Sequence, residues 1–251
     1  MAEHIFDSGY ALLIGVGADL PVTVKDATAL HKLLIDPVRC AYPSDHVEFL
    51  IESDATRANI LAALDRLDRR VMDGPDATVI IYFSGHGVES PDYYLLPYNY
   101  DLSDLPGTCL SGAEFTERLE ALHAQKLLVL LDACHAGGLA EVKGLPGITK
   151  SPVPANLVEA LLAGSGRVVI ASSRKDQKSL ILPGASYSAF TQALLEGLAG
   201  QGAAELDGYA RVADVAMYIS RVVSTRTNDR QHPILKLNKA DNFALAYYAG
   251  G

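Results

Sequence analysis

The sequence has no long apolar run and no concentration of basic residues, and each absence excludes a class of protein. No apolar stretch reaches the roughly 18 residues that are needed to cross a bilayer, so we expect no membrane segment. The first residues do not join a basic region to an apolar one, so we expect no secretory signal. The net charge is -9, which argues against a nucleic-acid partner.

Cysteine is also scarce. The three cysteines, Cys40, Cys109 and Cys134, are an odd number, lie far apart and form no Cys-x-x-Cys pair. This usage fits neither a disulfide framework nor a zinc site. It is typical of free thiols in a reducing compartment, so we expect a cytoplasmic protein.

Short apolar runs alternate with amphipathic segments along the whole chain. The runs are rich in Val, Ile and Leu and apolar on both faces, which is typical of parallel strands that are buried from both sides. They lie at residues 10–16, 47–51, 78–83, 126–131 and 167–172, and a last strand is expected at 234–237.

The segments between these runs repeat apolar residues at helical spacing. Helices are expected at residues 26–35, 56–72, 111–124, 188–198 and 209–223. Thr56 is the expected N-cap of the second helix, and Ser111 with Glu114 has capping-box spacing. The alternation predicts one α/β domain over residues 1–251, with a mostly parallel sheet and helices on both faces.

Two long segments are expected to be loops. Residues 90–112 are predicted to contain a small hairpin, and residues 137–157 are rich in Pro and Gly and are predicted to be flexible. Loops of this length inside a domain are usually functional or mobile.

Candidate chemistry follows two of the predicted strands. His86 lies in Ser84-Gly85-His86-Gly87, and Cys134 follows the run at 126–131. Alone, each has an ordinary interpretation, as a turn residue or a small buried apolar one. Together, they bring a thiol and an imidazole to the same edge of a parallel sheet, which is what nucleophilic catalysis by a thiol requires.

Other catalytic patterns are incomplete. Gly15-Val16-Gly17 follows the first strand but lacks the third glycine of a dinucleotide-binding loop. No Gly-x-Ser-x-Gly elbow is present, which argues against an esterase or amidase.

Several motifs, in order along nearly the whole chain, resemble the caspase-like cysteine peptidases, and most closely their metacaspase and bacterial caspase-homologue branch. The histidine and cysteine motifs are YFSGHG and DACHAG. The further matches are VKDATAL (24–30), ASSRKDQKS (171–179), SAFTQALLEGL (188–198) and Gln231-His232-Pro233. The resemblance implies a three-layer sandwich around a six-stranded sheet.

The resemblance also implies a cysteine endopeptidase that acts on protein or peptide substrates and needs no cofactor for its chemistry. Cys134 would be the nucleophile and His86 the general acid, with His135 as a weaker rival. The backbone N–H groups of Gly87 and Cys134 would form the oxyanion hole. No third triad member stands out, so a dyad is expected. The family implies a regulated pathway such as cell death or defence, with an upstream activating protease or regulator.

The residues that match the family's first substrate pocket are Asp26, Ser84 and Asp132, which implies cleavage after Arg or Lys. Two ordinary interpretations stay open, a helix N-cap for Asp26 and a turn aspartate for Asp132. Arg174 keeps an Asp-specific, caspase-type pocket open as an alternative. Leu180 and Ile181 stand where many relatives carry an acid, so the outer wall of the pocket is undefined.

Further candidate residues concern the regulation of the activity, by calcium or by cleavage of the chain. Asp101, Asp104 and Glu141 lie in the two loops where a calcium site could form, as many metacaspases require calcium. Lys143 and Lys150 are candidate processing sites in the loop at 137–157, which an ordinary solvent loop would also explain. A catalytically silent scaffold that binds a partner stays open as an alternative function.

Overall fold

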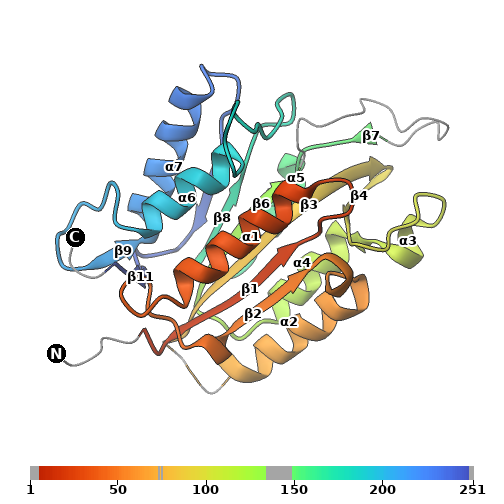
Figure 1. The fold of residues 1–251 in the computed structure, drawn as a ribbon. Coiled ribbons are helices and arrows are strands. Elements are labelled where there is room, and N and C mark those ends of the chain that lie inside the picture. The colour runs from red at the N-terminus through yellow and green to blue at the C-terminus, as the bar shows by residue number, and fades with distance from the viewer. Residues whose placement is uncertain (1–5, 73, 75, 134–148, 249–251) are drawn as a thin grey trace.

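The computed structural model describes residues 6–72, 74, 76–133 and 149–248, and it is built around a six-stranded sheet (Figure 1). Neighbouring strands are parallel except for the last pair, which is antiparallel. This confirms the predicted α/β fold. From one edge to the other, the strands are β2 (Val47–Ile51), β1 (Gly9–Gly15), β3 (Thr78–Ser90), β6 (Lys126–Ala133), β8 (Arg167–Ala171) and β10 (Ile234–Asn238).

Helices cover both faces of the sheet, and each face has its own hydrophobic cluster (Figure 1). The central strands are apolar on both sides because both of their faces are covered. One face carries α1 (Pro21–Leu34), α6 (Ala189–Leu198) and α7 (Val212–Arg226); the other carries α2 (Arg57–Val71), α4 (Gly112–Ala121) and α5 (Ala155–Ala160). Two 3-10 turns, η1 (Ser44–His46) and η2 (Glu52–Asp54), flank β2. Among the described residues, every helix is too short or too polar to cross a membrane.

Local sequence signals predict the starts of two helices correctly and the start of a third incorrectly. Thr56 Oγ1 accepts a hydrogen bond from the Asn59 amide, and Ser111 Oγ accepts one from the Glu114 amide, so both predicted N-caps are confirmed. The first helix, however, begins at Pro21 rather than at residue 26. Because Asp26 lies in the middle of α1, its interpretation as a helix N-cap is wrong.

Strand β3 is longer than predicted and changes partners along its length. Its last parallel pair with β6 is Gly85 with Ala133, and its first antiparallel pair with β4 (Asp92–Leu96) is His86 with Leu96. The prediction that this strand ends at residue 83, with His86 in a turn, is therefore wrong. Asp132 is likewise part of a strand, so its interpretation as a turn residue is also wrong.

A small outer sheet extends β3 beyond the central sheet. It contains the predicted hairpin and brings in chain from both long segments. Its other strands are β4, β5 (Leu110–Ser111) and β7 (Thr149–Lys150). Helix α3 (Leu105–Thr108) lies between β4 and β5. The expected loop at 137–157 thus contains β7 and the start of α5, while residues 134–148 lie outside the described residues.

The C-terminal part adds a two-stranded sheet at the far end of the molecule from α3 and β4 (Figure 1). Strand β9 (Tyr209–Arg211) pairs antiparallel with β11 (Ala244–Tyr247). The residues predicted to open the helix at 209–223 are therefore extended, and the helix runs from Val212 to Arg226 instead.

Candidate active site

The carboxyl ends of β3 and β6 lie side by side. Ser84 is in register with Asp132 and Gly85 with Ala133. In the sequence, His86 follows Gly85 and Cys134 follows Ala133, the last residue of β6. Cys134 itself, and with it His135, lies outside the described residues. Ser84 and His86 are two residues apart on one strand and therefore project to the same face.

The His86 imidazole is held by a residue that the sequence did not reveal as functional. His86 is 5% exposed, and its Nε2 lies 2.9 Å from Oδ1 of Asp19, whose side chain is half-exposed. An ionised carboxylate only accepts hydrogen bonds, so this contact places a proton on Nε2. Asp19 follows Gly15-Val16-Gly17, the segment that was of interest only as an incomplete dinucleotide loop.

Two carboxylates are buried beneath this edge of the sheet. Asp26 of α1 and Asp132 of β6 are both fully buried. Ser188, the N-cap of α6, joins them: its amide donates to Asp26 Oδ1 over 3.1 Å, and its hydroxyl donates to Asp132 Oδ2 over 2.6 Å. Ser188 Oγ also accepts from the Thr191 amide. Hydrogen bonds through Ser188 thus join two of the three predicted pocket residues, Asp26 and Asp132.

Burial and mutual repulsion change the ionisation of this pair. Burial, and then the charge of Asp132, raise the pKa of Asp26 to about 8, although hydrogen bonds from Ser188 and Thr191 lower it. At neutral pH the Asp26 carboxyl therefore keeps a proton. A cation that entered between the two carboxyls would favour release of that proton, because it would stabilise both charges.

Ser84, the third predicted pocket residue, is also fully buried and lies opposite Asp132 on the neighbouring strand. Ile80 and Tyr82 precede it on the same side of β3 and belong to the cluster beneath α1, α6 and α7. Ser84 therefore faces the same helices as the two carboxyl groups do.

Hydrogen bonds from the Gln231 side chain hold the segment that follows β8 in place beside this pocket. The buried Gln231 amide donates to the Ser172 carbonyl over 2.8 Å, and its oxygen accepts from the Leu180 amide over 2.8 Å. Leu180 in turn accepts from the Ala189 amide at the start of α6. Gln231 thus holds both ends of the segment from Ser172 to Leu180.

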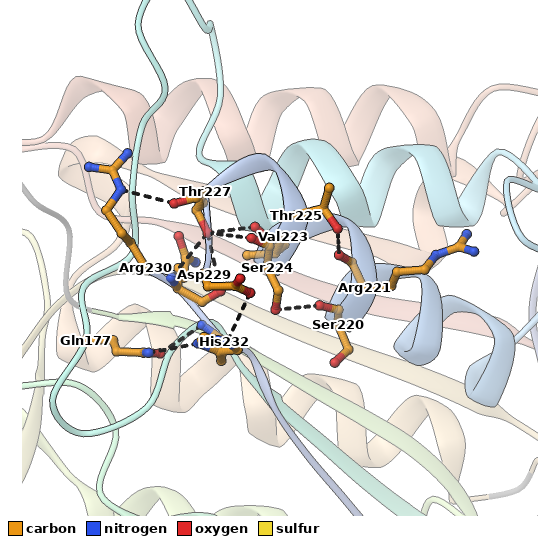
Figure 2. Close-up of polar contacts among 11 residues, drawn as sticks. Gln177, Ser220, Arg221, Val223, Ser224, Thr225, Thr227, Asp229, Arg230 and His232 are labelled. Carbon is orange, nitrogen blue, oxygen red and sulfur yellow. Dashed lines mark hydrogen bonds and ion pairs between the residues drawn. The ribbon is translucent and has the colours of Figure 1, made fainter.

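Figure 2 shows a second set of hydrogen bonds that holds the same segment, beyond the end of α7. Gln177 Oε1 accepts from the His232 amide, and Gln177 Nε2 lies 2.8 Å from His232 Nδ1. The turn that precedes His232 is closed by Thr227, whose carbonyl accepts from Arg230 Nε over 3.0 Å. Arg174 lies on the same segment, and its side chain is exposed. It is the residue on which an Asp-specific substrate pocket would depend.

Gly87, a predicted oxyanion-hole residue, lies in the outer part of β3 opposite Leu95 of β4. Its carbonyl accepts from the Ser151 amide over 2.9 Å. A Cβ at this position would overlap the hydroxyl of Tyr93, so close packing alone requires glycine here. The oxyanion role of Gly87 stays a prediction.

The two described cysteines are poor nucleophiles. Cys40 is fully buried, and burial raises the pKa of its thiol. Cys109 is 1% exposed, and burial raises its thiol pKa as well. Since the thiolate is the reactive form, neither is suited to catalysis.

The predicted calcium residues are only partly described. Asp101 Oδ1 accepts from the amide and hydroxyl of Ser103, which lowers the Asp101 pKa, and Asp104 caps α3 by accepting from the Gly107 amide. The described part of the chain has no group of three or more His, Cys, Asp or Glu side chains that could hold a metal ion. Glu141 lies outside it, so calcium binding stays a prediction.

The predicted processing sites also fall at the boundary of the described residues. Lys143 lies outside them. The backbone of Lys150 is part of β7 and pairs with Val88 of β3. Cleavage after Lys150 would therefore require β7 to separate from β3.

Comparison with known proteins gives consistent similarities. The family profile described as Caspase domain (Peptidase_C14) matches residues 8–243. Metacaspase-9 of Arabidopsis thaliana is 25% identical over 166 residues, which are 60% of this chain and 50% of that protein. The crystal structure of a protein from Geobacter sulfurreducens has the same fold, with a TM-score of 0.60 and 18% identity over 95% of this chain and 96% of that one.

Proposed function

The chain belongs to the caspase-domain family of cysteine peptidases, and on this premise we propose that it is an endopeptidase that cleaves polypeptides after Arg or Lys. The observation that carries the specificity is the buried pair Asp26 and Asp132, joined by Ser188 beneath the edge of the sheet that carries His86. A guanidinium or ammonium group is the natural partner of two carboxyls in such a place.

In the proposed reaction, the Cys134 sulfur attacks the scissile carbonyl carbon, and the thiol proton is held by His86. The carbonyl oxygen becomes an oxyanion against the backbone N–H groups of Gly87 and Cys134. The C–N bond then breaks, and His86 gives its proton to the leaving amine. Water, deprotonated by His86, hydrolyses the thioester and restores the thiol. Asp19 orients the imidazole throughout.

The Asp-specific alternative is less well supported by the same residues. An acidic substrate side chain would meet the buried charge of Asp132, which already raises the pKa of Asp26, and like charges in a buried site repel strongly. Arg174 is the cation that could offset them, but its side chain is exposed.

The direct test compares peptides that differ only in having Arg, Lys or Asp before the scissile bond. We expect cleavage after Arg and Lys, and none by Cys134→Ala. Asp132→Asn should lower kcat/KM on the Arg peptide by roughly 10- to 100-fold, because hydrogen bonds to charged groups contribute about 1.5–3 kcal/mol. Asp65→Asn is the matched control, since Asp65 is exposed and pairs with Arg118 on α2 and α4. Preference for Asp, or activity of Cys134→Ala, would refute the proposal.

Calcium and loop cleavage are proposed as the regulators of this activity. The same assay with calcium or with a chelator tests the first, and Asp101→Asn with Asp104→Asn should remove any calcium response. Fragment masses during incubation, compared with those of Cys134→Ala, test self-cleavage after Lys143 or Lys150. Undiminished activity of the Lys143→Ala, Lys150→Ala double variant would exclude these bonds.

A further inference from the structure

A second pocket lies at the amino end of the central sheet, at the opposite end of β8 from the candidate active site. Its volume is about 370 Å³, and it is lined by the turns that lead into β6 and β8 and by chain that follows β10. Arg167, the first residue of β8, lines it. Pockets for small molecules usually start at about 300 Å³, so the size suits a small ligand.

Arg167 is an unusual residue to find in this position. It is 5% exposed, and within the described part of the chain its Nε and Nη1 have no hydrogen-bond partner. The structure gives it no ion pair there either; Glu120 of α4 acts on it only from a distance, and burial lowers the pKa of Arg167. A buried guanidinium without partners is costly, because nothing replaces the water that it has lost.

The turn before β8 packs closely against the Arg167 side chain. A Cβ on Gly164, which also lines the pocket, would lie 2.6 Å from Arg167 Nε. Gly164 has φ +106°, so two separate constraints favour glycine there. The turn from α5 to β8 therefore packs directly against the Arg167 side chain, and this contact helps to bury the guanidinium.

The charges of the pocket are mostly positive. Besides Arg167 it is lined by Lys126, Lys239 and one acid, Asp241. Lys239 is exposed. Lys126 lies 3.6 Å from Asp76, but that carboxylate is 93% exposed and pairs of this kind are weak. Two positive charges are thus in excess, which matches the charge of about -1.5 to -2 on a phosphate monoester at pH 7.

We propose that this pocket binds the phosphate group of a small molecule, with Arg167 as the buried, directional contact and Lys126 and Lys239 at the mouth. Arg is suited to this role because its planar fork can donate two parallel hydrogen bonds to phosphate oxygens. The bound group would supply the partner that the buried guanidinium lacks.

The test measures binding on the full chain by calorimetry and thermal unfolding at constant ionic strength. The probes are inorganic phosphate, AMP and acetate, which separate free phosphate, a phosphate monoester and a carboxylate. We expect saturable binding of phosphate or AMP and a rise in Tm. Arg167→Met should weaken binding by about tenfold or more. Arg118→Gln, which removes an exposed positive charge from α4 outside the pocket, should bind as wild type does.

Two further measurements keep the proposal open to refutation. Without phosphate, Arg167→Met should unfold at the same temperature as wild type or higher, because it removes an unpaired buried charge. If that variant does not fold, Lys126→Gln with Lys239→Gln should still weaken phosphate binding. No saturable binding, equal binding by Arg167→Met, or equal binding of acetate would each overturn the proposal. None of these readouts depends on peptidase activity.

Discussion

Asp26 is the residue whose ionisation should be visible in the stability of the whole protein. Its pKa is raised to about 8 in the folded chain, whereas an unfolded aspartate titrates near about 3.9. Between these values the folded state holds one proton more than the unfolded state. The free energy of unfolding should therefore fall as pH rises from 4 to 8, by up to about 1.4 kcal/mol per pH unit, and then level off.

Urea unfolding at pH 5 and pH 7 measures this effect, with Asp26→Asn as the comparison. The variant cannot titrate at this position, so it should lose stability less steeply than wild type between the two pH values. Parallel pH profiles of the two proteins would contradict the raised pKa. The same proton should make the KM for Arg peptides fall as pH rises toward 8, because a bound cation favours the ionised carboxyl.

Asp19 should have a modest effect on catalysis, since it orients His86 without contacting substrate. The Asp19 carboxylate is half-exposed and therefore screened by water, and pairs with an exposed partner contribute about 1 kcal/mol or less. Asp19→Ala should therefore lower kcat by no more than about fivefold and leave KM unchanged. Asp19→Glu should restore part of the loss. A change confined to KM would show that Asp19 contacts the substrate instead.

Among the elements, the segment from Ser172 to Leu180 is held at both of its ends by one buried side chain, Gln231. Gln231→Glu keeps an acceptor for the Leu180 amide but places an oxygen against the Ser172 carbonyl. Because this leaves a buried acceptor without its donor, we expect local displacement at a cost of about 1–3 kcal/mol. KM should rise several-fold with kcat nearly unchanged, since His86 lies on another strand.

Gln177→Glu is the matched control for that variant. Gln177 is only half-buried, so water can replace its contact with His232. Its effect on KM should be smaller than that of Gln231→Glu. Equal effects of the two variants, or an equal loss of kcat, would show that Gln231 does not act through the segment it holds.

The elements also show what sequence patterns could and could not reveal. Strand β6 could be predicted because it is apolar on both faces, and α2 because Thr56 is a local signal. The outer half of β3 could not, since Ser84 to Gly87 has the composition of a turn and is extended only because β4 pairs with it.

Likewise, only some residues of the candidate site could be identified from the sequence. His86, Asp26 and Asp132 could be named from motifs. The contact of Asp19 with His86 joins residues 67 positions apart, and Ser188 reaches Asp26 across 162 positions. No local pattern encodes contacts of this kind. A capping serine before α6 was the one available hint of Ser188.

At the scale of the whole molecule, burial should divide the three thiols into two classes. Cys40 and Cys109 are closed off by the core. We therefore expect folded Cys134→Ala to resist iodoacetamide and to take up two labels only after unfolding. Wild type should take up one label quickly. Rapid labelling of folded Cys134→Ala would contradict the assignment of the nucleophile.

The order of the strands has a consequence for a chain that has been cut. Any break between residues 134 and 148 would leave β1, β2, β3 and β6 on one fragment and β7, β8 and β10 on the other. Those fragments still share the full ladder between β6 and β8 and the pairing of β3 with β7. Such a nicked protein should run as two bands in denaturing gels and as one particle in gel filtration. The two halves, expressed separately, are candidates for reconstitution by mixing.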